Sequence, residues 1–183
     1  MSRTAYGAPD APVTAAKREV EQHLQSSGLD YTILRCGFLM EVMVAPIVGF
    51  DYGNAKAVVY GSGENPLSLL SMDDVARMCA LCLDSPEASN AVIEFGGPEP
   101  VTLHELVRTF EEVKGQSFEM QHVPEEALVG AWESADEPVS KSINAIMVDF
   151  ARGDVIPMDE TLARFPVNMT TVRQYATNVL SSH

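Results

Sequence analysis

The segment from Pro12 to Arg35 combines a helix, a tight turn and a strand with almost no residues between them. Pro12 suits the first turn of a helix, apolar residues then recur at helical spacing, and Gly28 provides a C-terminal cap. Residues 31–35 are a short run of aromatic and β-branched side chains, which predicts a buried strand. A helix that leads directly into a buried strand favours the α/β fold class.

The same alternation of strands and helices continues along the chain. Residues 57–60 and 91–95 are candidate strands, and helices are expected after two capping pairs, Ser71 with Asp74 and Thr102 with Glu105. The apolar segment 38–48 is ambiguous between helix and loop, because it contains a proline.

From Ser117 onward the pattern changes to mostly helical. We therefore expect an α/β part over residues 1–116 and a mostly helical lobe over residues 117–183, with the first ten residues as an irregular lead-in.

The charge and hydropathy of the chain limit its partners. A net charge of -14 over 183 residues would repel a phosphate backbone, so nucleic-acid binding is not expected. No apolar run approaches the roughly 18 residues of a membrane span, so a membrane partner is not expected either. The first six residues have no apolar segment typical of a secretion signal, and we expect a cytoplasmic location.

The cysteines and histidines do not suggest a metal site. Three cysteines, Cys36, Cys79 and Cys82, are too few for a disulfide framework, and their odd number fits a reducing compartment. Cys79 and Cys82 form a CxxC pair within an apolar helical pattern, which favours buried packing over redox or zinc chemistry. The four histidines are scattered without ligand spacing, so we expect no metal.

Four stretches of the sequence resemble one known family. The most specific runs from Lys17 through SGLDYTILRCGFLME at residues 27–41. It is similar to NmrA-like proteins, a family of atypical short-chain dehydrogenases in which a lysine-bearing helix leads through SGLxYTILRPG into FFMEN. SMDDVA at 71–76, IEFGGPE at 93–99 and MVDFARG at 147–153 resemble three further family stretches in the same order.

This resemblance implies a Rossmann-like fold and the cofactor NAD(P)(H). Family members open with a strand and a glycine-rich turn, usually GxxGxxG, whose amides hold the cofactor pyrophosphate. The sequence contains no such motif. We therefore expect a partial Rossmann-like sheet that lacks the amino-terminal dinucleotide-binding strands and is followed by a mostly helical substrate lobe.

Lys17 is the residue to which the resemblance gives a catalytic and cofactor-binding role. In the family this lysine contacts the cofactor ribose and nicotinamide, and in some relatives it takes part in proton transfer. The alternative is a solvated helix lysine paired with Glu21 at i+4. Val13 stands where short-chain dehydrogenases carry their tyrosine, so Tyr-Lys catalysis is not expected.

The resemblance also implies a nicotinamide site at Cys36, Gly37 and Phe38, since these residues follow the carboxyl end of a strand. Cys36 replaces the family's proline, and its sequence neighbourhood offers no histidine to make it a nucleophile. Candidate substrate-binding residues are Met40, Glu41 and Trp132. For each of these, core packing is the alternative.

Three functions are compatible with these features. The first is the substrate-binding half of an NAD(P)-dependent oxidoreductase acting on a small organic molecule, not redox-competent by itself. The second is a non-redox binding module, isomerase or cyclase on a truncated scaffold, and the third is a regulatory or interaction protein. Under all three we expect a homo-oligomer or a complementing cofactor-binding chain, because a sheet edge without its neighbouring strands needs a cover.

Overall fold

A computed structural model describes residues 11–181. The predicted lead-in of ten residues lies outside this range. The strands are β1 (Thr32–Cys36), β2 (Phe38–Leu39), β3 (Phe50–Asp51), β4 (Lys56–Tyr60), β5 (Leu67–Leu70), β6 (Ala91–Phe95), β7 (Pro100–Val101) and β8 (Glu119–Val123). The α-helices are α2 (Pro12–Ser26), α3 (Met40–Met43), α4 (Met72–Asp84), α5 (Leu103–Lys114), α6 (Glu125–Glu133), α7 (Pro138–Arg152), α8 (Asp159–Arg164) and α9 (Val172–Ser181).

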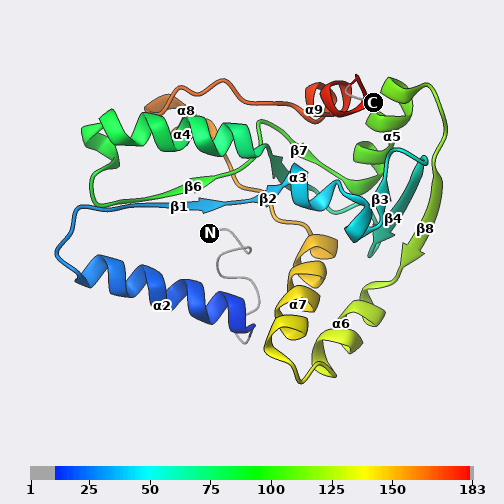
Figure 1. Ribbon diagram of the computed structural model, residues 1–183, viewed down its shortest axis with the longest axis horizontal. Helices are drawn as coiled ribbons and strands as arrows, with labels where there is room; N and C mark the ends of the chain where they lie inside the picture. The colour runs from blue at the N-terminus through cyan, green and yellow to red at the C-terminus, as the bar shows by residue number, and fades with distance from the viewer. Residues whose placement is uncertain (1–10, 182–183) are drawn as a thin grey trace.

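The predicted helix and strand at the start of the chain are confirmed as α2 and β1. β1 runs parallel to β6, with Thr32 opposite Ala91 and Cys36 opposite Phe95. α4 lies on one side of this pair and α2 on the other, which makes three layers (Figure 1). This arrangement is α/β, as the alternating pattern predicted.

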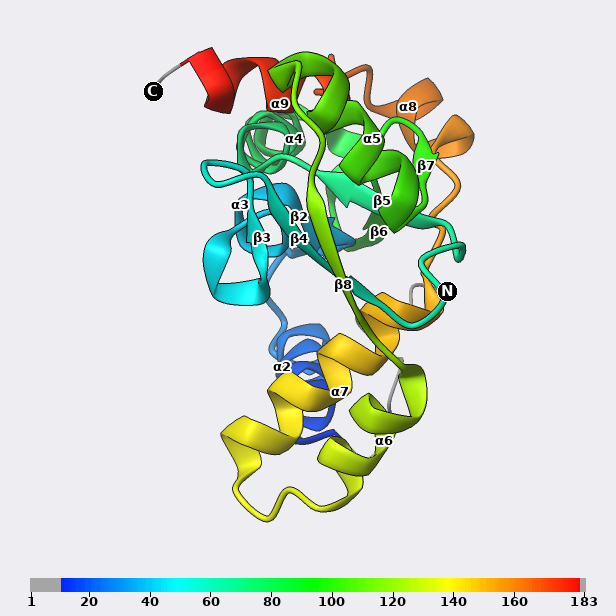
Figure 2. The same ribbon diagram turned by 90° about the vertical axis from the view of Figure 1, so that its right-hand side faces the viewer.

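Two small sheets continue the fold beyond β1 and β6. β2 pairs with β5 in parallel, and β7 pairs with β5 antiparallel. β4 pairs antiparallel with β3 and parallel with β8. Since β8 follows residue 116, the β4–β8 ladder connects the two predicted parts of the chain, as Figure 2 shows. The division into 1–116 and 117–183 stays a prediction.

One core cluster also extends across that boundary. Phe150 of α7 packs edge-on against Phe38 of β2, with ring centroids 5.1 Å apart. Both side chains are buried in the cluster that includes Phe50 and Phe110. α9 packs on α5, so helices from the last third of the chain complete a core begun by earlier strands.

Both predicted helix starts are present, but the second residue of the Ser71–Asp74 pair does not cap its helix. Thr102 and Glu105 form a reciprocal capping box at α5, as predicted. At α4 the Ser71 side chain accepts from the Asp73 amide, whereas Asp74 is fully buried and bonds to Thr170. The prediction of a capping pair was therefore wrong for Asp74, whose carboxylate anchors a distant segment.

The prediction that the CxxC pair is buried was wrong for Cys79. Cys79 is exposed and Cys82 is half-buried on α4, and the three cysteines are free thiols. The buried stripe of this helix follows Asp74, Met78 and Cys82, whose spacing keeps them on one face. Cys79 follows Met78 directly, so it turns about 100° away from that stripe.

Candidate functional site

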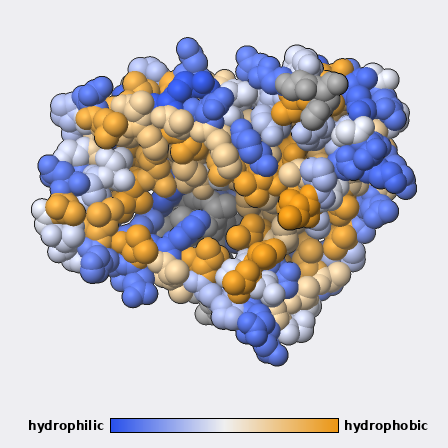
Figure 3. Space-filling view, in the orientation of Figure 1, coloured by the Kyte–Doolittle hydropathy of each residue, from blue (hydrophilic) through white to orange (hydrophobic). Residues whose placement is uncertain are grey.

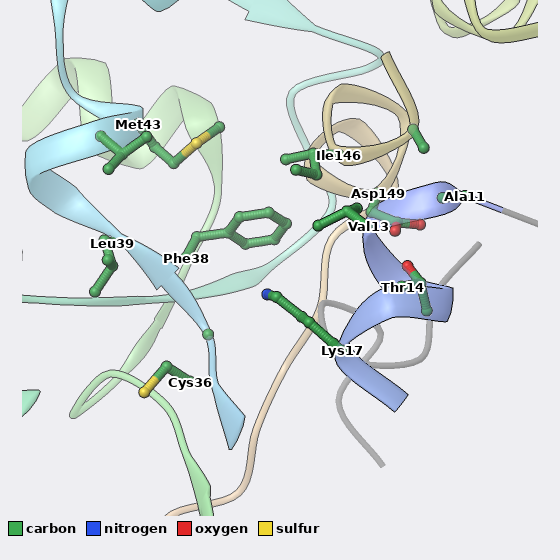
Figure 4. Close-up of a pocket in the computed structure, with 13 residues that line it drawn as sticks. Ala11, Val13, Thr14, Lys17, Cys36, Phe38, Leu39, Met43, Ile146 and Asp149 are labelled. Carbon is green, nitrogen blue, oxygen red and sulfur yellow. The ribbon is translucent and has the colours of Figure 1, made fainter. Parts of the chain in front are cut away.

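A pocket of about 290 Å³ lies at the carboxyl end of β1, between α2, α3 and α7. Most of its wall is apolar. Figure 4 shows its lining residues, and Figure 3 shows apolar side chains gathered over α3 and α7 on the face seen in Figure 1. The lining residues are Ala11, Val13, Thr14, Lys17, Cys36, Gly37, Phe38, Leu39, Val42, Met43, Ala145, Ile146 and Asp149.

Lys17 and the Cys36–Phe38 segment, which the sequence analysis singled out separately, line this same pocket. The Lys17 side chain extends from α2 toward the wall made by Cys36 and Phe38 (Figure 4). No Lys17–Glu21 ion pair is found within residues 11–181. Glu21 instead accepts two hydrogen bonds from Arg35 of β1, at 2.7 and 3.1 Å.

The Glu21–Arg35 pair fixes α2 against β1. Both side chains are largely buried, with exposed fractions of 14% and 13%. Burial raises the pKa of Glu21, and the Lys17 ammonium nearby acts in the opposite direction. The pair therefore holds the helix that carries Lys17 at a set position beside the strand end.

Gly37 allows the chain to turn closely over the neighbouring strand. Its amide donates to the Phe95 carbonyl at 2.9 Å. A Cβ at this position would lie 3.0 Å from the Ser68 carbonyl oxygen and 3.3 Å from Ile156. A side chain there would press on β5 and displace it by a few tenths of an ångström, so the close approach favours glycine.

The Cys36 thiol is poorly suited to act as a nucleophile. Burial raises the pKa of Cys36 to about 11, with a further upward effect from Cys79 and a smaller opposing effect from Lys17. Since the thiolate is the reactive form, Cys36 stays protonated at neutral pH and contributes an apolar surface to the pocket.

The three predicted substrate-binding residues lie outside the lining of this pocket. Met40 is fully buried in the main core. Both carboxylate oxygens of Glu41 are used at the start of α4, where they accept from the Ser71 hydroxyl and the Met72 amide at 3.0 Å. Trp132 packs against Ala11 and Ala145. Their assignment to substrate stays a prediction.

Sequence reasoning missed two polar residues of the pocket. Thr14 is buried one helical turn before Lys17, and Asp149 reaches the pocket from α7. Thr14 could have been found from its i, i+3 spacing to Lys17, which places both on one helix face. Asp149 lies in the MVDFARG stretch that resembles the family, but that stretch did not mark it as a pocket residue, because its position depends on how α7 packs against α2.

The described residues offer no metal centre or membrane-spanning helix. Within 11–181 no three His, Cys, Asp or Glu side chains gather closely enough to hold a metal ion. Over the same range no helix has the length and apolar character needed to cross a bilayer.

An α/β protein with a pocket at a strand's carboxyl end is the class defined by this fold and site. Its family follows from comparison with known proteins. The NmrA-like family model matches residues 1–176, so the chain belongs to the NmrA-like family.

Among curated relatives, the isoflavone reductase homolog IRL of Zea mays is 26% identical over 192 residues, which cover 98% of this chain and 62% of the maize protein. Phenylcoumaran benzylic ether reductase POP1 of Populus trichocarpa is 25% identical over 154 residues, covering 80% of this chain and 49% of that protein. The chain thus spans less than two thirds of either relative.

Solved structures share the fold at low sequence identity. An isoflavone reductase structure matches with a TM-score of 0.74 and 19% identity, covering 94% of this chain and 60% of that one. The quinone oxidoreductase QOR2 of Escherichia coli, solved with NADPH, matches with a TM-score of 0.70 and 21% identity, covering 95% and 62%. These similarities establish the α/β fold of the family.

Proposed function

We propose that this chain is the substrate-side part of an NAD(P)-dependent oxidoreductase acting on a small organic molecule. The observation that carries the proposal is that Lys17 and Cys36–Phe38, distant in sequence, line one pocket at the carboxyl end of β1. Open α/β sheets bind ligands at this end of their strands. Family membership and the NADPH held by the related quinone oxidoreductase support the same cofactor class.

The pocket residues fit the nicotinamide end of such a cofactor. Phe38 provides an apolar wall for a flat ring, and Gly37 lines the pocket beside it. The chain offers no comparable site for the cofactor pyrophosphate, because its sequence has no glycine-rich turn before a helix. We therefore propose that a second polypeptide segment holds the phosphates and that this chain does not transfer hydride alone.

When bound, the cofactor would supply the hydride. The contribution of the chain's own residues is to bind, orient and exclude water. The Lys17 ammonium would donate hydrogen bonds to a ribose hydroxyl or to a substrate oxygen, and it would stabilise negative charge that develops there. The apolar wall around Phe38 and Leu39 lowers the local dielectric, which strengthens that interaction.

The free edge of β1 supports the proposal of a partner. Among the described strands, β1 pairs with β6 on one side and has no strand on the other. α2 and α4 cover the two faces of this pair (Figure 1). An edge strand between two helices is a template for one more parallel strand. We propose that this edge is covered by the complementing segment or by a second copy of the chain.

A comparison of two ligands tests the cofactor proposal. Reduced nicotinamide mononucleotide carries the ring and ribose without the pyrophosphate, and NADPH carries the whole cofactor. Titration calorimetry of both against the chain should give weak binding in each case, with NADPH gaining less than about tenfold, or 1.4 kcal/mol. Lys17→Ala should weaken the mononucleotide further, whereas the control Lys56→Ala, which removes an exposed lysine outside the pocket, should not.

Two results would contradict this proposal. Low micromolar NADPH binding by a single copy of the chain would show that no second segment is needed for the phosphates. Failure of the mononucleotide to bind, or mononucleotide binding that Lys17→Ala leaves unchanged, would remove the nicotinamide site and favour a non-redox binding module.

A further inference from the structure

Strand β8 has one edge that no other strand covers. Among the described strands, β8 pairs in parallel with β4 and stands at the end of its three-stranded sheet. It borders the molecule on the right in Figure 1 and lies in front in Figure 2, so both views place it at the surface. The backbone groups on its outer edge are therefore available to a further strand.

The sequence of β8, Glu-Met-Gln-His-Val, lacks the features that usually prevent pairing at an edge. Such edges are commonly protected by proline, by lysine, by a bulge or by a very short strand. β8 contains no proline or lysine, and all five of its residues stay in register with β4. The carboxylate of Glu119 forms an ion pair with Lys56 of β4 at 3.3 Å. The edge is thus of ordinary length for a strand, and its one acidic side chain is paired.

Hydrogen bonds at the two ends of β8 identify which backbone groups face outward. The first residue of the strand donates its amide to the Ala55 carbonyl at 2.8 Å, and the last accepts from the Gly61 amide at 2.9 Å. Backbone groups alternate between the two edges of a strand, so those of Gln121 also point toward β4. The N–H and C=O groups of Met120 and His122 therefore point toward the outer edge.

The outer edge is closed at both ends of the strand. The Phe118 amide, two residues before Met120, already donates to the Glu111 carboxylate of α5 at 2.8 Å. Pro124, two residues after His122, has no amide hydrogen to donate. Between residues 118 and 124, Met120 and His122 are thus the two residues that offer both a donor and an acceptor on this edge.

This pattern of donors and acceptors is self-complementary. Two residues directly opposite each other in an antiparallel ladder exchange two hydrogen bonds when their backbone groups face each other. With Gln121 on a two-fold axis, Met120 of each copy stands opposite His122 of the other, so every open group finds a partner. A shift along the strand would require either the Phe118 amide, which is already bonded, or an amide hydrogen that Pro124 lacks. A single register therefore satisfies the edge.

We propose that β8 is a dimerisation edge, along which two copies of the chain pair antiparallel about Gln121. The pairing joins the two three-stranded sheets into one across a two-fold axis. Glu119 then lies opposite Val123 of the second copy, so no like charges face each other directly. The inference does not rest on the proposed function, because β8 and β1 belong to different sheets.

Sedimentation velocity of the full chain tests for the dimer. Pairing through one short strand buries less than the roughly 1,200–2,000 Å² of stable interfaces, so the average mass should rise toward twice that of the monomer between about 1 µM and about 1 mM. Met120→Pro removes an outward N–H and keeps the bonds to β4, and it should weaken the dimer at least about tenfold. The matched control Met120→Ala removes the same side chain but keeps the amide, and it should change the dissociation constant by less than about threefold.

Cysteine cross-linking tests the register, in a Cys79→Ser background because that native thiol is exposed. Gln121 would face its counterpart as a non-hydrogen-bonded pair with Cα atoms about 4.5 Å apart, which a disulfide can span. Gln121→Cys should therefore give a covalent dimer when oxidised glutathione is added. Glu119→Cys, on the same face of the strand, would lie well beyond the limit of about 7 Å from its counterpart and should stay unlinked.

A chain that stays monomeric up to about 1 mM would overturn the inference. A dimer that Met120→Pro leaves unchanged would overturn it as well, and so would equal cross-linking of Gln121→Cys and Glu119→Cys. If Met120→Pro does not fold, the cross-linking pair decides, because neither cysteine removes a backbone hydrogen bond.

Discussion

The fully buried carboxylate of Asp74 offers the sharpest test of how the carboxy-terminal segment is held. Asp74 lies on α4 and accepts from the Thr170 amide at 2.8 Å and from the Thr170 hydroxyl at 3.0 Å. It also forms an ion pair with Arg77, whose side chain is 49% exposed. These bonds fasten the segment between α8 and α9 to a helix almost one hundred residues earlier in the chain.

Replacing Asp74 with alanine removes the acceptor and leaves the Thr170 amide without its bond. A hydrogen bond to a charged group contributes about 1.5–3 kcal/mol, and an unsatisfied buried donor costs about 1–3 kcal/mol. Water can solvate the half-exposed Arg77 side chain, so loss of its ion pair with Asp74 adds little to the free-energy cost. The expected loss is therefore about 3 kcal/mol, which for a chain of this size lowers Tm by roughly 6–12 °C.

Urea unfolding monitored by circular dichroism measures this loss of unfolding free energy, and Asp73→Ala is the matched control. Asp73 is exposed in the first turn of the same helix, so its removal should cost about 0.3–1 kcal/mol. Thr170→Val keeps the amide bond and removes the hydroxyl, which donates to Asp74 and accepts a longer bond from Arg77, and a double-mutant cycle with Asp74→Ala should give a coupling of about 1–2 kcal/mol. Equal effects of Asp74→Ala and Asp73→Ala, or no coupling, would refute the anchoring role.

Three further predictions concern Gly37 and Cys36 in the pocket. Gly37→Ala should lower Tm by several degrees because its methyl group would press on the Ser68 carbonyl, whereas Gly130→Ala, with no atom within 4 Å of the added Cβ, should be neutral or stabilising. A disulfide reagent should modify exposed Cys79 at neutral pH and leave Cys36 unmodified in the folded chain. Unfolded Cys36 ionises near its ordinary pKa of 9.0 and the folded thiol at a pKa of about 11, so the folded state binds more protons in between and its free energy of unfolding should fall as pH rises through that window. Cys36→Ala should remove that part of the slope; an identical slope, or rapid Cys36 modification at pH 7, would contradict the burial argument.

Local signals were sufficient for much of the fold. Strand β6 was predicted with its observed bounds, and the capping box at Thr102 was predicted with its partner. Strand β5, by contrast, was missed, because its four residues are all buried and show no alternation. The two-residue strands β3 and β7 exist only through pairing with β4 and β5, which no local pattern contains.

In the candidate site, too, some residues were predicted from the sequence and others were not. The motif around Lys17 and Cys36–Phe38 was visible in the sequence through its resemblance to a family, and these residues share one pocket. The match of Met40 and Glu41 to the family's substrate-side segment suggested a substrate role, which stays a prediction; Met40 lies in the core and Glu41 bonds to the start of α4. Periodicity could not distinguish an apolar side chain that faces a pocket from one that faces the core.

The sequence by itself determined the α/β class, the family and the strand-end segment of the pocket, because helix caps, periodicity and short motifs are properties of neighbouring residues. Only the tertiary structure decided that Asp149 would stand across the pocket from Lys17. More than one hundred residues separate the two, and their approach depends on how α7 packs between α2 and the core. Packing between distant segments is set by the shapes of many side chains at once, which no short stretch of sequence contains.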